Sequence, residues 1–70
     1  MVRKSVISSN LKSVGYDSFQ MVLEIEFLEG SVYQYYGAPQ SVYASLMSAS
    51  SHGMYFHADI RNNYRYSQVG

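Results

Sequence analysis

The chain has 70 residues, a mass of 8.0 kDa and no cysteine, so it has room for one small domain that spans residues 1–70. Five basic and five acidic residues cancel, which argues against a protein that holds nucleic acid mainly through a large positive charge. With 47% hydrophobic residues the chain is too apolar for a disordered tail, yet no apolar run approaches the roughly 20 residues of a membrane span.

The N-terminal residues do not resemble a secretion signal. Residues 1–4 are basic, but residues 5–10 are too polar for the apolar centre of a signal peptide. We therefore expect a cytoplasmic protein that does not bind a membrane.

Two stretches before residue 17 predict extended structure. Residues 11–16 predict a strand, with a bulge at Gly15. Residues 6–9 form a shorter extended stretch, which is either a strand of its own or the first half of one bent strand.

Hydrophobic residues alternate with other residues over residues 19–28, which predicts a half-buried strand. Glu24 and Glu26 are expected to face water, and the opposite face to enter the core. The expected core positions are Phe19, Met21, Leu23, Ile25 and Phe27. Gly30 predicts a tight turn because glycine accepts a positive φ, and residues 31–36 then form the returning strand.

After Pro39 the hydrophobic spacing changes to that of helices. A first helix is predicted by the spacing of Val42, Leu46 and Ala49, with Tyr43 and Met47 beside them. Ser50 or Ser51 is expected to cap a second helix, along which Phe56, Ile60 and Tyr64 recur at every fourth position. Strands followed by helices predict an α+β domain: an antiparallel sheet of three strands, or four, followed by two short helices packed on one face.

A series of short motifs runs in order through nearly the whole chain. The motifs are Ser8-Ser9-Asn10, Gly15-Tyr16-Asp17, Glu24-Ile25-Glu26-Phe27 with Gly30, Tyr33 with Tyr35, Pro39 with Val42-Tyr43 and Leu46-Met47, Ser50-Ser51-His52-Gly53 with Tyr55-Phe56, and Ile60-Arg61 with Tyr64. The series resembles the KTSC domain, a family named for the C-terminus of some lysyl-tRNA synthetases and also found as stand-alone proteins of bacteria and phages. The resemblance implies a non-catalytic module, and RNA binding is the function suggested for the family.

Eight tyrosines and no tryptophan allow two interpretations. In one, rings such as Tyr33, Tyr43 and Tyr55 lie in or beside the core, with their hydroxyl groups reaching water or backbone. In the other, the rings near the end of the returning strand and in the tail form a platform on which a base stacks, or a protein interface. The residues of this predicted platform are Tyr35, Tyr36, Tyr64 and Tyr66.

Arg61 and Arg65 are four residues apart and interleaved with tyrosines. If the second helix continues to residue 65, both guanidinium groups project from one side and can grip a phosphate. The alternative is a cationic helix end, or an ion pair of Arg61 with Asp59, Glu24 or Glu26. Ser51 or Asn10 is expected to supply a further polar contact to the ligand.

His52, His57 and Asp59 do not form a recognisable metal site or acid–base set. The five-residue gap between the histidines does not place them on one helical face, and no third strong ligand is evident. Ser9, Ser50 and Ser51 lack the sequence context of a nucleophile. We expect a protein without catalytic activity, metal or cofactor, in which each histidine faces solvent or caps a helix.

The sequence thus predicts a binding module that recognises a nucleotide-type ligand, either unpaired RNA or a small nucleotide signal, by tyrosine stacking and arginine–phosphate contacts. We expect a homo-oligomer, because two copies can enclose a ligand that one small domain leaves exposed. In a phage, such a protein would act by sequestering a host signal. The alternative is a module that binds a partner protein through the tyrosine face or by strand addition at the sheet edge.

Overall fold

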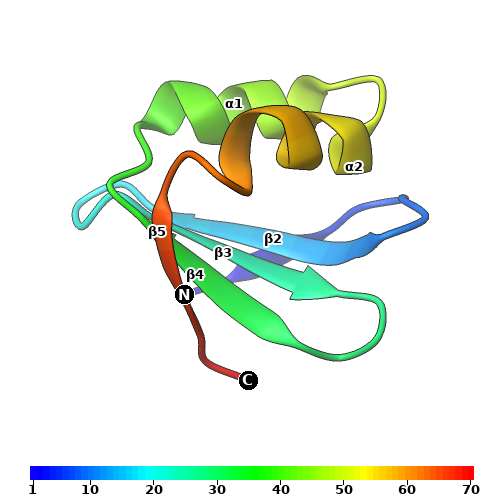
Figure 1. The fold of residues 1–70 in the computed structure, drawn as a ribbon, viewed down its shortest axis with the longest axis horizontal. Helices are drawn as coiled ribbons and strands as arrows, with labels where there is room; N and C mark the ends of the chain where they lie inside the picture. Colours follow the sequence, from blue (N-terminus) through cyan, green and yellow to red (C-terminus); the bar gives the residue numbers. More distant parts are fainter.

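An antiparallel sheet of five strands, with two helices across one face, makes up the computed structural model, which describes residues 1–70 (Figure 1). The strands follow one another in sequence order across the sheet. In chain order the elements are β1 (Arg3–Ser5), β2 (Leu11–Asp17), β3 (Val22–Phe27), β4 (Val32–Tyr36), α1 (Gln40–Ser48), α2 (His52–Tyr55), the π-helical turn η1 (Phe56–Ile60) and β5 (Arg65–Gln68). The predicted α+β class is confirmed, with more strands than expected.

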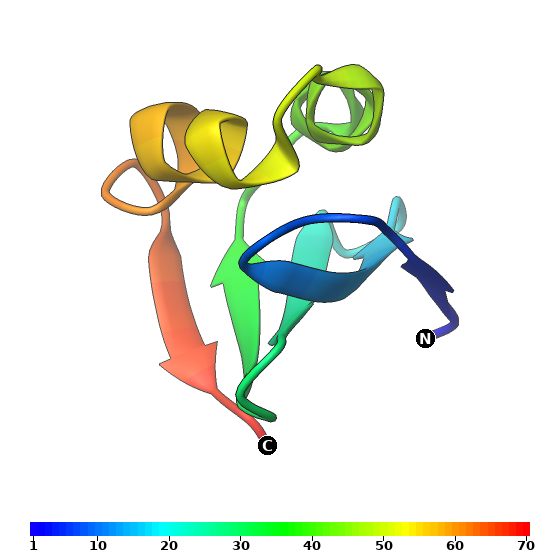
Figure 2. The ribbon, with the colours of Figure 1, turned by 90° about the vertical axis from the view of Figure 1, so that its right-hand side faces the viewer.

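The two edge strands account for the difference in strand number (Figure 2). β1 lies at residues 3–5 and not at the predicted residues 6–9. The last residues form β5, because the predicted second helix ends at Ile60. The side-chain amide of Asn63 donates to the Asp59 carbonyl at 2.8 Å, and its backbone N–H donates to the Ile60 carbonyl at 3.1 Å. These bonds use carbonyl groups that a continuing helix would need.

The alternation in β3 is confirmed at its centre and wrong at its start. Leu23 and Ile25 are fully buried, as predicted, but Phe19 is 94% exposed. The Asp17 carboxylate accepts the backbone N–H groups of Phe19 and Gln20, and Met21 has a φ of 58°. The turn between β2 and β3 therefore extends to Met21, so Phe19 and Met21 do not lie on the core face where they were predicted.

Gly15 serves close packing and not a bulge. The register shift of β2 lies between Leu11 and Ser13 instead. A Cβ atom at Gly15 would lie 3.0 Å from the Arg3 side chain and 3.0 Å from the Val2 carbonyl oxygen. The absence of a side chain thus lets β1 pass close to β2. The turn at Gly30 is as predicted, with a φ of 107°.

The core lies between the sheet and the helices. Leu11, Val14, Leu23, Ile25, Tyr35, Ala38, Leu46, Phe56 and Ile60 form one buried cluster. Tyr43 packs partly buried against it and stacks on Tyr16, with ring centroids 5.2 Å apart. Ser51 caps α2, as predicted, by accepting the Met54 N–H. His52 donates from Nδ1 to the Leu46 carbonyl at 2.8 Å, which ties the start of α2 to α1.

Candidate functional site

A groove of about 380 Å³ opens between η1 and the β4–β5 side of the sheet. Its walls carry five aromatic rings and a polar rim, and we call it the aromatic groove. The rings belong to Phe27, Tyr33, Tyr35, Phe56 and Tyr66. Its size lies at the lower end of the range for small-ligand sites, about 300–1,000 Å³.

Strand alternation places the tyrosines of the groove on one face. Tyr35 lies opposite Leu23 on β3 and opposite Tyr66 on β5, so all three side chains point toward the helices. The Tyr35 ring centroid lies 5.5 Å from that of Phe56 and 5.7 Å from that of Tyr66. Tyr35 is 4% exposed and forms the floor, whereas Tyr66 is 58% exposed and forms the outer wall.

The Tyr35 hydroxyl group is the polar point at the floor of the groove. It makes no hydrogen bond within the chain, and no fully buried side-chain oxygen or nitrogen lacks a partner. The hydroxyl therefore reaches solvent through the groove. Burial, and secondarily the neighbouring Tyr33 and Tyr66, raise the pKa of Tyr35 to about 12. The group is thus a neutral hydrogen-bond donor at physiological pH.

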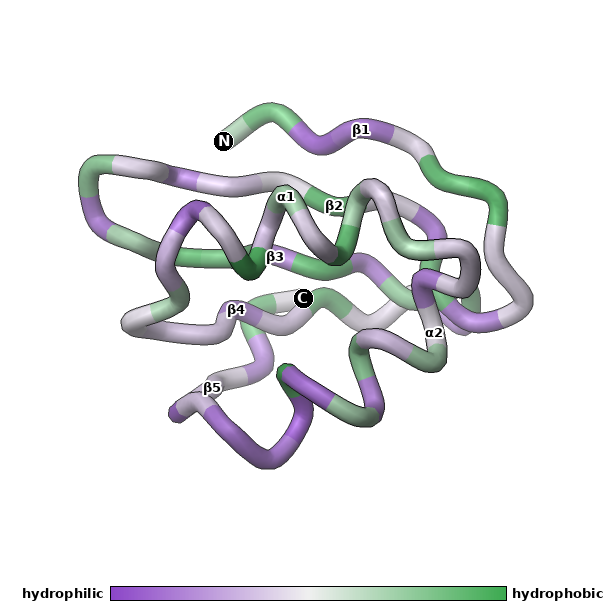
Figure 3. The backbone as a smooth tube through the Cα atoms, turned by 90° about the horizontal axis from the view of Figure 1, so that it is seen from above, coloured by the Kyte–Doolittle hydropathy of each residue, from purple (hydrophilic) through white to green (hydrophobic).

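The rim of the groove is polar and carries one fixed positive charge. Arg61 ends η1, and its Nη1 lies 3.5 Å from His57 Nδ1. Asn10 lies on the other side of His57, with its side-chain nitrogen 3.2 Å from Nε2. Asn62 completes the rim. From above, the segment between η1 and β5 stands out as a hydrophilic stretch (Figure 3).

Arg61 makes none of the ion pairs that the sequence offered as an alternative. The ion pairs of the structure join Arg3 or Lys12 to Glu24 or Glu26, and no carboxylate lines the aromatic groove. The guanidinium group is exposed at the end of η1. Its charge is therefore available to an anionic ligand.

Four of the predicted site residues come together and four do not. Asn10, Tyr35, Arg61 and Tyr66 line the aromatic groove. Tyr36 and Arg65 are paired across β4 and β5 and point to the opposite face of the sheet. The predicted joint grip of Arg61 and Arg65 is therefore wrong, because the helix ends before Arg65 and strand alternation turns that side chain away.

Tyr64 and Ser51 also lie outside the groove. Tyr64 is half-buried and packs against the core. The Ser51 hydroxyl is occupied by the Met54 N–H at 3.2 Å. The tyrosine platform of four rings predicted from the sequence therefore does not form as one surface.

Several groove residues were not predicted as site residues. Tyr33 was expected at the core edge, and Phe27, Phe56, His57 and Asn62 had no predicted role in a site. Period-two alternation places Tyr33 beside Tyr35, and this signal could have found it. No local signal could have brought His57 to Asn10, because the two are 47 residues apart in the chain.

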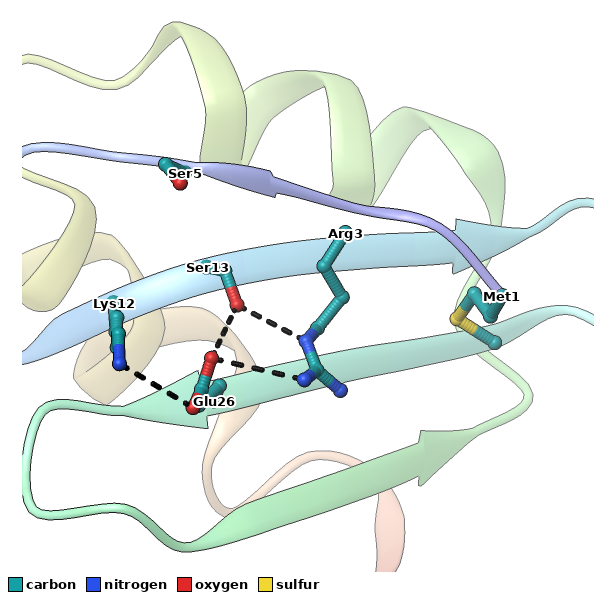
Figure 4. Close-up of a pocket in the computed structure, with 6 residues that line it drawn as sticks. All are labelled: Met1, Arg3, Ser5, Lys12, Ser13 and Glu26. Atoms are coloured by element: carbon teal, nitrogen blue, oxygen red, sulfur yellow. Dashed lines mark hydrogen bonds and ion pairs between the residues drawn. The ribbon is translucent and has the colours of Figure 1, made fainter.

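The opposite face of the sheet holds a second hollow, of about 340 Å³, between β1 and β3 (Figure 4). Arg3 donates from Nε to the Ser13 hydroxyl at 3.0 Å, and Ser13 donates to Glu26 at 2.9 Å. Lys12 Nζ lies 3.8 Å from the other Glu26 oxygen. The polar groups of this hollow are therefore bonded to one another, and the bonds of Arg3 hold β1 against β2 and β3.

Glu24 was predicted to face water, but it is 8% exposed beneath Arg3. Gln34 donates to one carboxylate oxygen at 2.8 Å, and Arg3 donates to the other. Burial acts to raise the pKa of Glu24, but the hydrogen bonds from Gln34 and Arg3 and the charge of Arg3 outweigh it. The pKa of Glu24 therefore lies below its ordinary value.

Two further features bear on the class of protein. No three His, Cys, Asp or Glu side chains are grouped so that they could hold a metal ion. None of the helices has the length and apolar character needed to cross a bilayer.

Comparison with known proteins decides the family. The sequence model of the KTSC domain matches residues 7–64. The chain belongs to the KTSC domain family. A crystal structure of a KTSC domain protein from Yersinia pestis shares 38% sequence identity and superposes with a TM-score of 0.96, over 99% of this chain and 97% of that one.

Relatives occur both as small proteins and inside a larger enzyme. An uncharacterized protein of Stutzerimonas stutzeri is 39% identical, with 99% of each chain covered. A lysine–tRNA ligase of Trichormus variabilis is also 39% identical over 87% of this chain, but that match covers 11% of the ligase. The KTSC domain is thus a unit that occurs by itself or as part of a synthetase.

Proposed function

We propose that this KTSC domain is a binding module without chemistry of its own, which takes a nucleotide-type ligand in the aromatic groove. The base stacks against Tyr66, and the phosphate lies at Arg61. The ligand is either an unpaired RNA segment or a small nucleotide, since both offer a flat ring next to a phosphate. The observation that carries this proposal is that an exposed ring and a guanidinium group without a carboxylate partner line the same groove.

The geometry of the groove supports an unpaired base in particular. Tyr66 offers a largely exposed ring, and Tyr33 and Tyr35 hold it from behind at centroid distances of 5.9 and 5.7 Å. A ring fixed in this way loses little freedom when a base stacks on it. Such a stack contributes about 1–3 kcal/mol. The Tyr35 hydroxyl and the Asn10 amide then lie within the same groove for the polar edge of the base.

The zero net charge of the chain fits a ligand with few phosphates. A duplex-binding protein neutralises many phosphates, whereas the aromatic groove presents one arginine and a neighbouring histidine. One or two phosphate contacts suit a mononucleotide or a turn in a single strand. The lysine–tRNA ligase relatives act on tRNA, which is consistent with a ligand of this chemistry.

The separation of the two arginines supplies the test. Binding of adenosine monophosphate and of a short single-stranded RNA is measured by titration calorimetry with the wild type, Arg61→Ala and Arg65→Ala. Loss of a charge-assisted contact costs about 1.5–3 kcal/mol, so Arg61→Ala should weaken binding by roughly 10- to 150-fold. Arg65→Ala, on the opposite face, should bind as the wild type does.

The salt dependence gives a second reading of the same experiment. Arg61→Ala should reduce the slope of log affinity against log salt concentration for the RNA by roughly one. Equal losses in both arginine variants would show diffuse attraction and contradict a site at the groove. The absence of binding to either probe would reject a nucleotide ligand and favour a partner protein on the same tyrosines.

A further inference from the structure

β1 and β5 form the two edges of the sheet (Figure 2). They differ in the features that oppose pairing with another strand. β1 is three residues long and carries Arg3 and Lys4, and charges of this kind oppose edge-to-edge association. β5 carries a single charge, at Arg65, and has none over residues 66–68 and no proline. The β5 edge is therefore less protected than the β1 edge.

The hydrogen bonds of β4 show which backbone groups this edge leaves free. Val32 donates to the Gly70 carbonyl and accepts from both Val69 and Gly70. In an antiparallel pair, alternate residues bond to the neighbouring strand. Because Val32 bonds to β5, Gln34 and Tyr36 do so as well, and the residues opposite them are Ser67 and Arg65. Tyr66 and Gln68 therefore direct their N–H and C=O groups away from the sheet.

We propose that a second copy of this chain pairs with the β5 edge, antiparallel and with the two-fold axis at Ser67. Tyr66 and Gln68 of one copy then exchange backbone hydrogen bonds with Gln68 and Tyr66 of the other, about four bonds in all. The two Ser67 residues face each other in the position without hydrogen bonds. The result is one continuous sheet with the helices of both copies on the same face.

The residues of β5 fit this symmetric arrangement. In this register the neutral Tyr66 meets the neutral Gln68, and Arg65 meets Val69, so no two like charges lie directly opposite. The same pairing brings Gln68 and Arg65 of the second copy beside Tyr66 and Val69, which are 58% and 52% exposed in the single chain. A second copy is thus the partner that the charge and symmetry of the edge favour.

Dimerisation would also extend the aromatic groove. Residues 66 and 68 lie on the helix-covered face, so Gln68 of the second copy comes to lie beside Tyr66 at the open side of the groove. Each copy then supplies a carboxamide to the site of the other. This consequence for the ligand rests on the proposed function, but the pairing of the strands does not.

Sedimentation equilibrium of the wild type, without ligand, tests the pairing. The expected mass is twice 8.0 kDa at high micromolar chain concentration. Gln68→Pro removes an outward N–H while leaving the bonds to β4 intact, and it should return the protein to a monomer. Ser5→Pro is the matched control, because the Val6–Lys12 hydrogen bond directs Ser5 outward from the β1 edge. This variant should remain a dimer.

A disulfide tests the register without placing a proline in the strand. The chain has no cysteine, and opposed residues in a position without hydrogen bonds lie about 4.5 Å apart at Cα. Ser67→Cys should therefore form a covalent dimer on mild oxidation, and Ser5→Cys should remain mostly monomeric. Because this result needs no proline, it decides the matter even if Gln68→Pro fails to fold.

The outcomes of these experiments distinguish failure of the β5 dimer from failure of nucleotide binding. A wild type of 8.0 kDa at millimolar concentration, or equal cross-linking of both cysteine variants, would overturn the β5 dimer and leave nucleotide binding intact. A dimer that binds neither adenosine monophosphate nor RNA would confirm the pairing and reject the proposed function.

Discussion

The two faces of the sheet use similar residues and differ in what they leave available. On the helix-covered face, Tyr66 is exposed and Arg61 has no carboxylate partner. On the opposite face, Arg3 and Lys12 are matched by Glu24 and Glu26, whereas Arg65 makes no ion pair. The number of tyrosines or arginines therefore does not mark a site in this protein. The aromatic groove differs from the opposite face in gathering five aromatic rings around an arginine without a carboxylate.

The faces also differ in their response to pH. Burial raises the pKa of Tyr35 and that of Tyr16, both on the helix-covered face. On the opposite face, the pKa of Glu24 is lowered. Base should therefore weaken the fold through the first face and acid through the second.

The largest expected effect is on stability, and it compares a core residue with a turn residue that the hydrophobic alternation wrongly predicted to be buried. Leu23→Ala opens a cavity among fully buried residues and should lower the free energy of unfolding by about 2–5 kcal/mol. Phe19→Ala, at a side chain 94% exposed, should change it by less than about 0.5 kcal/mol. Urea denaturation measures both. Comparable losses would show that Phe19 is packed in solution.

The next effect concerns the stability of the fold at alkaline pH. Because the folded-state pKa of Tyr35 is about 12 and the unfolded value is 10.0, the unfolded chain loses its proton first. Stability should then fall as pH rises above about 10, by about 2 kcal/mol at pH 12. In Tyr35→Phe this part of the alkaline loss should vanish. An unchanged alkaline profile would contradict a buried Tyr35, and thermal denaturation at a series of pH values distinguishes the two.

A third prediction compares one tyrosine from each face. Tyr66→Ala removes the exposed wall of the groove and should weaken RNA binding by roughly 5- to 150-fold, equivalent to about 1–3 kcal/mol. Tyr36→Ala removes a ring from the opposite face, where its hydroxyl bonds Ser67, and should leave the affinity unchanged. Fluorescence anisotropy of a labelled single strand measures both. A greater loss of affinity in Tyr36→Ala would place the ligand on the opposite face of the sheet.

The smallest effect concerns acid. Because the pKa of Glu24 is lower in the folded chain than the ordinary value of 4.5, its stabilising contribution is complete above about pH 4.5 and is lost as pH falls below that value. Glu24→Gln keeps the size of the side chain without the charge, so its stability should depend less on pH in this range. Circular dichroism during acid titration is the measurement. A steeper acid transition in the variant would contradict the role given to Arg3 and Gln34.

The fold was largely predictable because its signals are local. Alternation in residues 22–27, the glycine at the β3–β4 turn and the helical spacing after Pro39 each specify an element within a few residues. The errors arose where a side chain overrides the pattern. Asp17 holds a turn that excludes Phe19, and Asn63 ends the helix before Arg65.

The candidate site was predictable only in part, because its residues are distant in the chain. Local sequence is enough to show that tyrosines alternate on β4 and that an arginine follows Ile60. The tertiary structure alone decided that Tyr66 pairs with Tyr35, that His57 meets Asn10 and that Arg65 points to the opposite face. The physical reason is that strand register and the end of a helix set the direction of each side chain, and both depend on contacts between segments that are separate in the sequence.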